Sequence, residues 1–94
     1  MSRFILNHDK DSVVTALTPM EAGETLRLKN DGPYEITIKE YIPFAHKCAI
    51  RNIRRGEKVI KYGESIGVAT SDIEPGQHVH VHNLQSVRGT IGGK

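Results

Sequence analysis

The segment Asn30-Asp31-Gly32-Pro33-Tyr34-Glu35-Ile36-Thr37-Ile38-Lys39 places a turn directly in front of a strand. Asp31 and Gly32 tolerate the backbone dihedrals of a tight turn, and Pro33 fixes the conformation in which the chain restarts. Polar and apolar residues alternate from Glu35 to Lys39, as they do in a strand with one buried face. The segment therefore predicts a turn followed by a half-buried strand.

Turn-forming residues alternate with short apolar runs along the whole chain. Short runs rich in Val, Ile and Thr lie between Gly, Pro, Asn and Asp residues, and no stretch has the pattern of a long amphipathic helix. This pattern predicts an all-β domain. The expected strands span residues 4–6, 12–17, 25–29, 34–39, 47–50, 58–62, 66–70 and 78–82.

A faint internal repeat adds detail to this prediction. Three segments share a glycine, then Glu or Gln, one variable residue and an aliphatic residue: Ala22-Gly23-Glu24-Thr25-Leu26, Arg55-Gly56-Glu57-Lys58-Val59 and Pro75-Gly76-Gln77-His78-Val79. Each glycine is expected to take a positive φ in a tight turn that begins a strand. Short strands entered through such turns favour a compact fold of bent hairpins over a long flat sheet.

Length and composition exclude several classes of protein. The 94 residues, 37% of them apolar, predict one domain with a modest core. No apolar run approaches the roughly 18 residues of a membrane span, and the first seven residues are too short and polar for a secretory signal. A single cysteine, Cys48, forms no internal disulfide and favours a reducing, cytoplasmic location. The absence of Trp and the 5% aromatic content argue against nucleic-acid binding.

Positive charge is concentrated in one stretch. Residues 47–61 contain six basic residues and one acidic residue, a net charge of +5, whereas the rest of the chain has a net charge of −3. Such a cluster attracts carboxylates, phosphates or an acidic partner surface, although it is also compatible with a solvated edge.

The segment His78-Val79-His80-Val81-His82 contains the most informative side chains. As one strand, it would direct its three imidazoles to one face and its two valines to the core. Imidazole is both a metal ligand and a base near pH 7. Same-face residues of a strand lie about 6.5–7 Å apart, so two of these histidines and a residue from elsewhere are expected at one ion. Exposed histidines bonded to water or backbone are the structural alternative.

Other reactive residues give weaker indications. His46 lies in a loop that enters a strand, and His8 lies in a polar turn that accommodates it without a function. Cys48 lies within an expected buried strand, where an isolated thiol is more often inert packing than a nucleophile. Lys61 begins the turn Lys61-Tyr62-Gly63-Glu64, which is either a simple hairpin turn or an anion clamp.

Three motifs give the sequence a resemblance to a known family. They are Ile42-Pro43-Phe44-Ala45-His46-Lys47, residues 59–70 and His78-Val79-His80-Val81-His82-Asn83-Leu84. In this order they resemble the small N-terminal SAF domain of altronate and galactarate dehydratases, which also occurs as a separate small subunit of two-component lyases. The resemblance covers about residues 12–84. We expect residues 1–94 to form a single domain, in which residues 85–94 are a flexible tail. The family usually has glycine where this chain has Ala45, and alanine with positive φ costs about 1–2 kcal/mol.

The resemblance implies a β-clip fold and a cytoplasmic lyase that removes water or sulfite from a small anionic hydroxy acid. It also implies a large catalytic partner subunit and a divalent metal such as iron or manganese. The expected catalytic residues are His46, His80 and His82, of which His80 and His82 would also bind the metal. The expected substrate-binding residues are Lys47, Lys61 and Asn83. The chain lacks a complete site, so we expect one shared with the partner at an interface.

Two other interpretations stay open. The chain could be a SAF-type module that binds a sugar acid or organises an assembly without chemistry, or a metal-binding or metal-delivery protein. Affinity of the isolated domain for a hydroxy acid would favour the first, and stoichiometric metal after purification the second. No nucleic-acid or membrane partner is expected, whereas short edge strands would permit a homo-oligomer.

Overall fold

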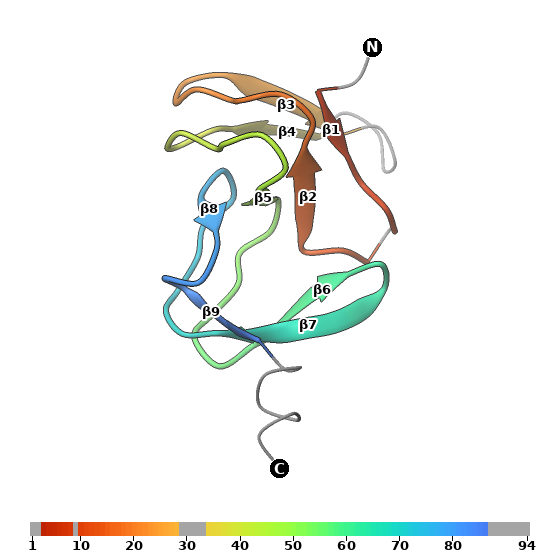
Figure 1. Ribbon diagram of the computed structural model, residues 1–94, viewed down its shortest axis with the longest axis vertical. Helices are drawn as coiled ribbons and strands as arrows, with labels where there is room; N and C mark the ends of the chain where they lie inside the picture. Colours follow the sequence, from red (N-terminus) through yellow and green to blue (C-terminus); the bar gives the residue numbers. More distant parts are fainter. Residues whose placement is uncertain (1–2, 9, 29–33, 87–94) are drawn as a thin grey trace.

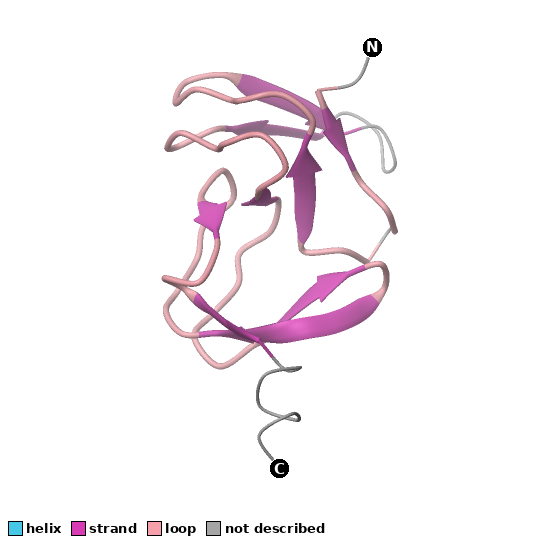
Figure 2. Cartoon of the chain, viewed as in Figure 1, coloured by secondary structure: helices cyan, strands magenta, loops and turns pink. Residues whose placement is uncertain are grey.

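In a computed structural model, the described part of the chain comprises residues 3–8, 10–28 and 34–86 (Figure 1). The regular elements in these ranges are all strands (Figure 2). No helix in these ranges is long and apolar enough to cross a membrane. The strands are β1 (Phe4–Ile5), β2 (Val13–Ala16), β3 (Thr25–Leu28), β4 (Tyr34–Thr37), β5 (Lys47–Ala49), β6 (Lys58–Lys61), β7 (Glu64–Ala69), β8 (His78–Val79) and β9 (Leu84–Ser86).

The strands form three small antiparallel sheets. The central sheet has the order β1-β2-β5-β8, the second is the hairpin β3-β4, and the third has the order β6-β7-β9. In Figure 1 the β3-β4 hairpin lies above the central sheet and the β6-β7-β9 sheet lies below it. The predicted all-β fold of short bent hairpins is therefore confirmed.

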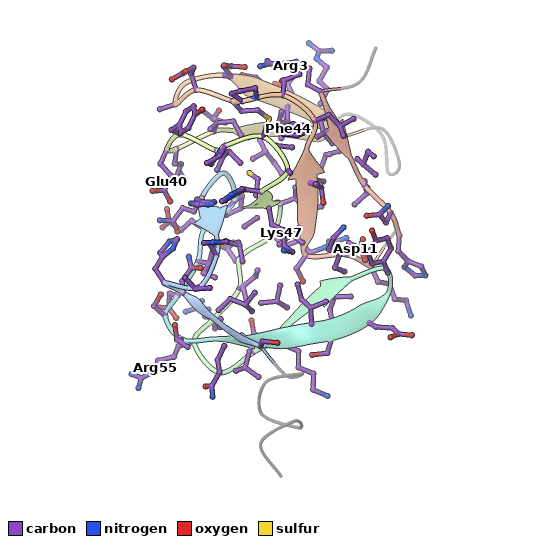
Figure 3. The ribbon with its side chains drawn as sticks, viewed as in Figure 1. Arg3, Asp11, Glu40, Phe44, Lys47 and Arg55 are labelled. Carbon is purple, nitrogen blue, oxygen red and sulfur yellow. The ribbon has the colours of Figure 1, made fainter. Side chains whose placement is uncertain are left out.

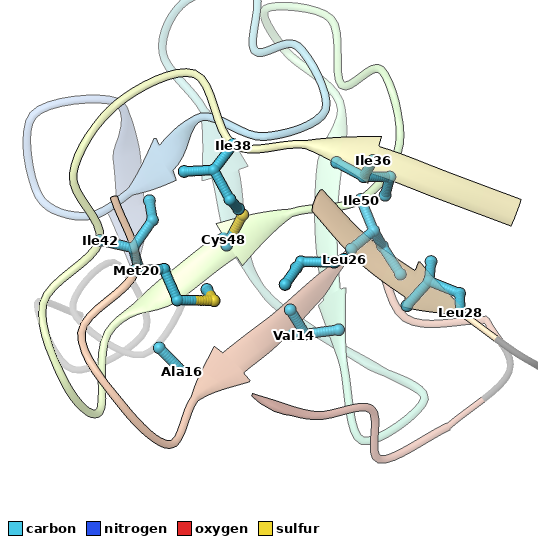
Figure 4. Packing of buried hydrophobic residues seen from close by; sticks show 10 residues of the cluster. All are labelled: Val14, Ala16, Met20, Leu26, Leu28, Ile36, Ile38, Ile42, Cys48 and Ile50. Atoms are coloured by element: carbon cyan, nitrogen blue, oxygen red, sulfur yellow. The ribbon is translucent and has the colours of Figure 1, made fainter. Parts of the chain in front are cut away.

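The central sheet separates two apolar clusters. Neighbouring strand residues point to opposite faces, so Val14 and Cys48 enter one cluster whereas Val13 and Ala49 enter the other. Both faces of β2 and β5 are consequently buried, which explains why these strands lack the polar–apolar alternation of a surface strand. Figure 4 shows the first cluster, which consists of Val14, Ala16, Met20, Leu26, Leu28, Ile36, Ile38, Ile42, Cys48 and Ile50.

The fold contains the same unit twice: a turn, a hairpin and a second turn. In the first unit, the 20–24 turn and the 42–46 turn flank β3-β4 and are joined by the bridge between Met20 and Ile42. In the second, the 53–57 turn and the 73–77 turn flank β6-β7 and are joined by the bridge between Ile53 and Ile73. The four apolar residues at these bridges are all buried. The sequence repeat of three segments thus corresponds to four turns.

The glycine prediction is confirmed in all three repeat segments. Gly23, Gly56 and Gly76 have φ values of 97°, 91° and 93°. In the fourth turn the equivalent residue is Ala45, whose φ is 71°. The left-handed conformation is thus a property of the turn, whichever residue occupies it.

The last part of the expected strand pattern differs from the structure. The strand expected over residues 78–82 ends at Val79, because residues 80–83 form a turn in which the Asn83 amide donates to the carbonyl of His80 (3.0 Å). Val81 is consequently 81% exposed and does not face the core. Leu84–Ser86 form β9, a strand that the sequence did not predict, and it pairs with β7, so residues 85 and 86 of the expected tail lie in a strand. The turn expected over residues 30–33 lies outside the described residues.

Candidate metal centre

Three imidazoles from two distant segments converge beside β8. His46 comes from the 42–46 turn, His78 from β8, and His80 from the turn that follows it. Their candidate ligand nitrogens all lie within 4.8 Å of one another. Nδ1 of His46 is 2.9 Å from Nε2 of His78, and the rings of His46 and His80 stack with centroids 4.6 Å apart. We refer to His46, His78 and His80 as the histidine cluster.

Pairing of β5 with β8 creates this proximity. In the antiparallel register Cys48 lies opposite His78 and Lys47 lies opposite Val79. Residue 46, which directly precedes β5, is therefore carried alongside the start of the turn that follows β8. The carbonyl of His46 also accepts a hydrogen bond from the Ala16 amide (2.8 Å), which holds the backbone at this position to β2.

Asn83 fixes the backbone that presents His80. Its Oδ1 accepts from the His80 amide (2.9 Å), and its Nδ2 donates to the His78 carbonyl (2.9 Å). Both ends of the Asn83 amide are thus bonded to the backbone, and the residue is 6% exposed. The structure places Asn83 beside the cluster, inside the turn, where it orients the histidines.

His82 lies at the edge of the cluster. Its ring centroid is 5.4 Å from that of His78, with the planes tilted by 45°. His80 and His82 do not share one face of a strand, because the chain turns after Val79, and the three histidines whose ligand atoms lie together are those of the cluster. Sequence reasoning left His78 out of the site. No pattern within one segment indicated it, because the pairing of β5 with β8 that brings His78 to His46 is a long-range contact.

The surroundings of His78 favour its neutral form. Burial lowers the pKa of His78 below its ordinary value, and the nearby imidazoles of His46, His82 and His80 lower it further. The negative charge of the Glu40 carboxylate opposes this effect, and its Oε2 is held near His78 by accepting from the His78 backbone amide (3.0 Å). Figure 3 shows Glu40 beside β8. A neutral imidazole has the lone pair that a metal ion or a proton requires.

The donor set fits a transition-metal ion. Imidazole nitrogens bind zinc and related ions at about 2.0–2.1 Å, which places two nitrogens on a tetrahedral ion about 3.4 Å apart. The cluster nitrogens span up to 4.8 Å, so side-chain rotations would bring them to that spacing. Three imidazoles leave at least one coordination position for a further ligand, which is the arrangement of catalytic rather than structural sites.

Comparisons with known proteins place the chain in a family. The family described as "Altronate/galactarate dehydratase SAF domain" matches residues 2–87. The chain belongs to this family. It is 38% identical over 93 residues to the (2R)-sulfolactate sulfo-lyase subunit alpha of Chromohalobacter salexigens, covering 94% of this chain and 99% of that protein. It is also 37% identical over 86 residues to the altronate dehydratase of Bacillus subtilis (strain 168), covering 92% of this chain but only 17% of that protein.

The remaining predicted residues of this SAF domain lie at different distances from the cluster. Lys47 follows His46 in the chain, and in the view of Figure 3 it lies between β8 and β2. Lys61 lies elsewhere: it is buried, its Nζ donates to Oδ1 of Asn7 (2.7 Å), and it sits over the ring of Tyr62 (4.1 Å). In the turn that follows Lys61, the amide of Gly63 donates to Oδ1 of Asp11 (2.8 Å). Figure 3 shows Asp11 on the side of the molecule away from Glu40. Lys61 and the cluster are therefore not brought together.

Two other reactive residues of the SAF domain, Cys48 and His8, lie outside the histidine cluster. Cys48 is fully buried in the first apolar cluster, and burial raises the pKa of its thiol to about 12. This agrees with the expectation of inert packing. His8 is exposed, and its Nδ1 accepts from the backbone amide of Lys10 (3.1 Å). Its ring lies against Gly63 in the turn between β6 and β7, away from the histidine cluster.

Proposed function

We propose that this SAF domain is the small subunit of a two-component lyase and acts in the cytoplasm. Its partner is a separate, larger catalytic subunit, and together they remove water or sulfite from a small anionic hydroxy acid such as altronate, galactarate or sulfolactate. The observation that carries the proposal is the convergence of His46, His78 and His80 in a chain that matches a sulfo-lyase alpha subunit over nearly its full length.

The reaction defines what the site must supply. A proton leaves the carbon beside the carboxylate, the electron pair of that C–H bond forms a C=C bond, and hydroxide or sulfite leaves the next carbon with its bonding pair. The proton is weakly acidic, so a positioned base is required. The pKa of His78 is lowered, which favours its neutral form, and His80 is exposed on the outer side of the cluster. We assign His82 as the base, because it is exposed, lies at the edge of the cluster and is not one of the three candidate ligands.

A divalent metal such as iron or manganese would be held by His46, His78 and His80. When bound, it would neutralise the substrate carboxylate and polarise the leaving group. His46 and His78 come from half-buried positions, whereas His80 is exposed, so the substrate side of the ion would face outward. Lys47, at the base of the 42–46 turn, would bind a remote carboxylate of the substrate.

The site requires a second chain to enclose it. A pocket of this domain is lined by Asn52, Ile53, Arg54, Asp72, Ile73 and Glu74, which does not include the histidines. Phe44 and Val81, each within two residues of a cluster histidine, are 61% and 81% exposed. In the altronate dehydratase of Bacillus subtilis the matched segment is a small part of a much longer chain. We therefore propose that the large subunit covers Phe44, Val81 and the histidine cluster.

Reconstitution tests the proposal. The large subunit is produced with and without this chain, and elimination from sulfolactate, altronate and galactarate is followed by product formation. Neither chain alone should reach the turnover of the mixture. His46→Ala or His80→Ala in the small chain should lower turnover at least about 100-fold, as expected for loss of a base or ligand, whereas His8→Ala should not. Full activity of the large subunit alone would overturn the proposal and favour a non-catalytic binding or assembly module.

A further inference from the structure

The four turns of the repeated unit differ in one hydrogen bond. In the 20–24 turn, the backbone amide of Glu21 donates to Oε2 of Glu24 (2.7 Å). In the 53–57 turn the Arg54 amide donates to Oε1 of Glu57 (2.7 Å), and in the 73–77 turn the Glu74 amide donates to Oε1 of Gln77 (2.6 Å). In these three turns the fifth residue therefore caps the amide of the second.

The 42–46 turn keeps the backbone of the others but cannot form this bond. The amide of His46 donates to the carbonyl of Pro43 (3.1 Å), as Glu24 does to Glu21, Glu57 to Arg54 and Gln77 to Glu74. The second residue is Pro43, however, which has no backbone N–H. The fifth residue is His46, whose Nδ1 instead lies 2.9 Å from Nε2 of His78.

We propose that Pro43 is a positioning residue that keeps the His46 imidazole out of its own turn and in the histidine cluster. A backbone amide at position 43 would point at the side chain of residue 46, as it does in the three other turns. Because proline removes that donor, the only hydrogen-bond partner that the described structure gives Nδ1 of His46 is another imidazole. The inference concerns the site of the proposed function and rests on it for its metal-binding consequence alone.

A shorter side chain can form the capping bond as well as a glutamate can. In the turn of residues 80–83, the His80 amide donates to Oδ1 of Asn83 across the same three-residue interval, at 2.9 Å. Nδ1 of histidine lies at the same distance along the side chain as Oδ1 of asparagine. An amide at position 43 would thus have an acceptor within reach, in direct competition with His78.

Pro43→Ala tests this inference, because it restores the donor. The first measurement is ¹⁵N NMR of the metal-free protein, which reports the exchange rate of the residue 43 amide and the hydrogen-bonding state of His46 Nδ1. We expect the new amide to be protected and bonded to His46, and the contact between His46 and His78 to be lost. Pro75→Ala is the matched control, since Pro75 occupies the third position of its turn, where no side-chain cap forms.

A backbone ester at position 43 distinguishes two effects of Pro43, the absence of an N–H donor and the rigidity of the proline ring. Lactic acid at position 43 has neither ring nor N–H, and it can be introduced in a synthetic 1–47 segment ligated to a segment that begins at Cys48. This variant should retain the His46–His78 contact, whereas Pro43→Ala should lose it. If the ester variant loses the contact too, or if the Pro43→Ala amide exchanges freely and the contact remains, the inference is wrong.

Zinc affinity gives the second readout. Pro43→Ala should weaken Zn²⁺ binding about 10–100-fold, the loss typical of residues that orient metal ligands, and the ester variant should bind like the unaltered chain. If the unaltered chain binds no Zn²⁺, the metal proposal fails, but the NMR comparison still decides the role of Pro43. Equal affinity of the unaltered chain and Pro43→Ala, in a chain that does bind Zn²⁺, would contradict the inference.

Discussion

Nδ1 of His46 and Nε2 of His78 lie 2.9 Å apart, although the two residues are separated by 32 positions in the chain. The contact joins the second turn of the first structural unit to the short strand that closes the second unit. It therefore depends on the register of the central sheet.

Metal binding should depend on the cluster histidines. Substitution of His46, His78 or His80 by alanine should weaken Zn²⁺ or Co²⁺ binding by more than about 100-fold, since loss of a ligand exceeds the loss caused by outer partners. His82→Ala should have a smaller effect, and His8→Ala none. Isothermal titration with the metal-free protein measures the affinities. A larger loss for His82→Ala than for His78→Ala would restore the pair of His80 and His82 as the ligands.

The free energy of unfolding of the metal-free chain should rise as the pH increases toward about 6.5. Burial and the neighbouring imidazoles lower the pKa of His78 in the folded protein, so the unfolded chain binds that proton more readily. The resulting stability is complete above the unfolded pKa of about 6.5 and is lost as the pH falls through the folded value. Urea titrations at pH 5.5 and 7.5 measure the difference. His78→Gln should reduce it, and an unchanged difference would contradict the pKa assignment.

Two glycines with nearly equal φ should respond differently to alanine. At Gly56 a Cβ would meet no atom within 4 Å, so Gly56→Ala should cost only the left-handed conformation, about 1–2 kcal/mol. At Gly76 a Cβ would overlap the Thr37 carbonyl oxygen, which adds a packing penalty and brings the loss to about 3 kcal/mol or more. Urea unfolding measures both variants. Equal losses would show that the backbone near Thr37 adjusts freely.

Ala45→Gly should stabilise the domain. The φ of 71° costs alanine about 1–2 kcal/mol of folding free energy, and glycine removes this cost. Glycine also increases the conformational entropy of the unfolded chain, which offsets part of the gain. We expect a net gain of up to about 1 kcal/mol in unfolding free energy. Leu17→Gly, in a position without positive φ, should instead destabilise. Loss of stability in Ala45→Gly would mean that the methyl group of Ala45 makes a compensating contact.

The basic stretch should contribute to assembly with the large subunit. Arg54 and Arg55 are exposed, and reversal of both charges should weaken association, more strongly at low salt than at high salt. Binding to the large subunit at several salt concentrations measures the effect, with Lys10→Glu and Arg27→Glu together as a control of equal charge. Affinity that does not change with salt would identify the stretch as solvated surface.

The sequence by itself determined the fold class, the positions of most strands and the turns that begin them. These are local properties. Positive φ favours glycine, so the turns at Gly23, Gly56 and Gly76 can be predicted from the glycines themselves. Strands bury apolar residues, so short apolar runs predict the strands. The histidines were likewise identified as the reactive side chains. What remained undetermined was which of them meet.

Only the tertiary structure decided which of the candidate side chains lie together. Whether residue 80 continues a strand or enters a turn depends on Asn83, which bonds the backbone on both sides of Val79. Whether His46 reaches His78 depends on the pairing of β5 with β8, which brings together residues from two structural units. Lys61 was predicted to bind substrate, as Lys47 was, but its place at the end of β6 directs it to Asn7. Long-range pairing fixes such relations, and a residue pattern within one segment does not contain them.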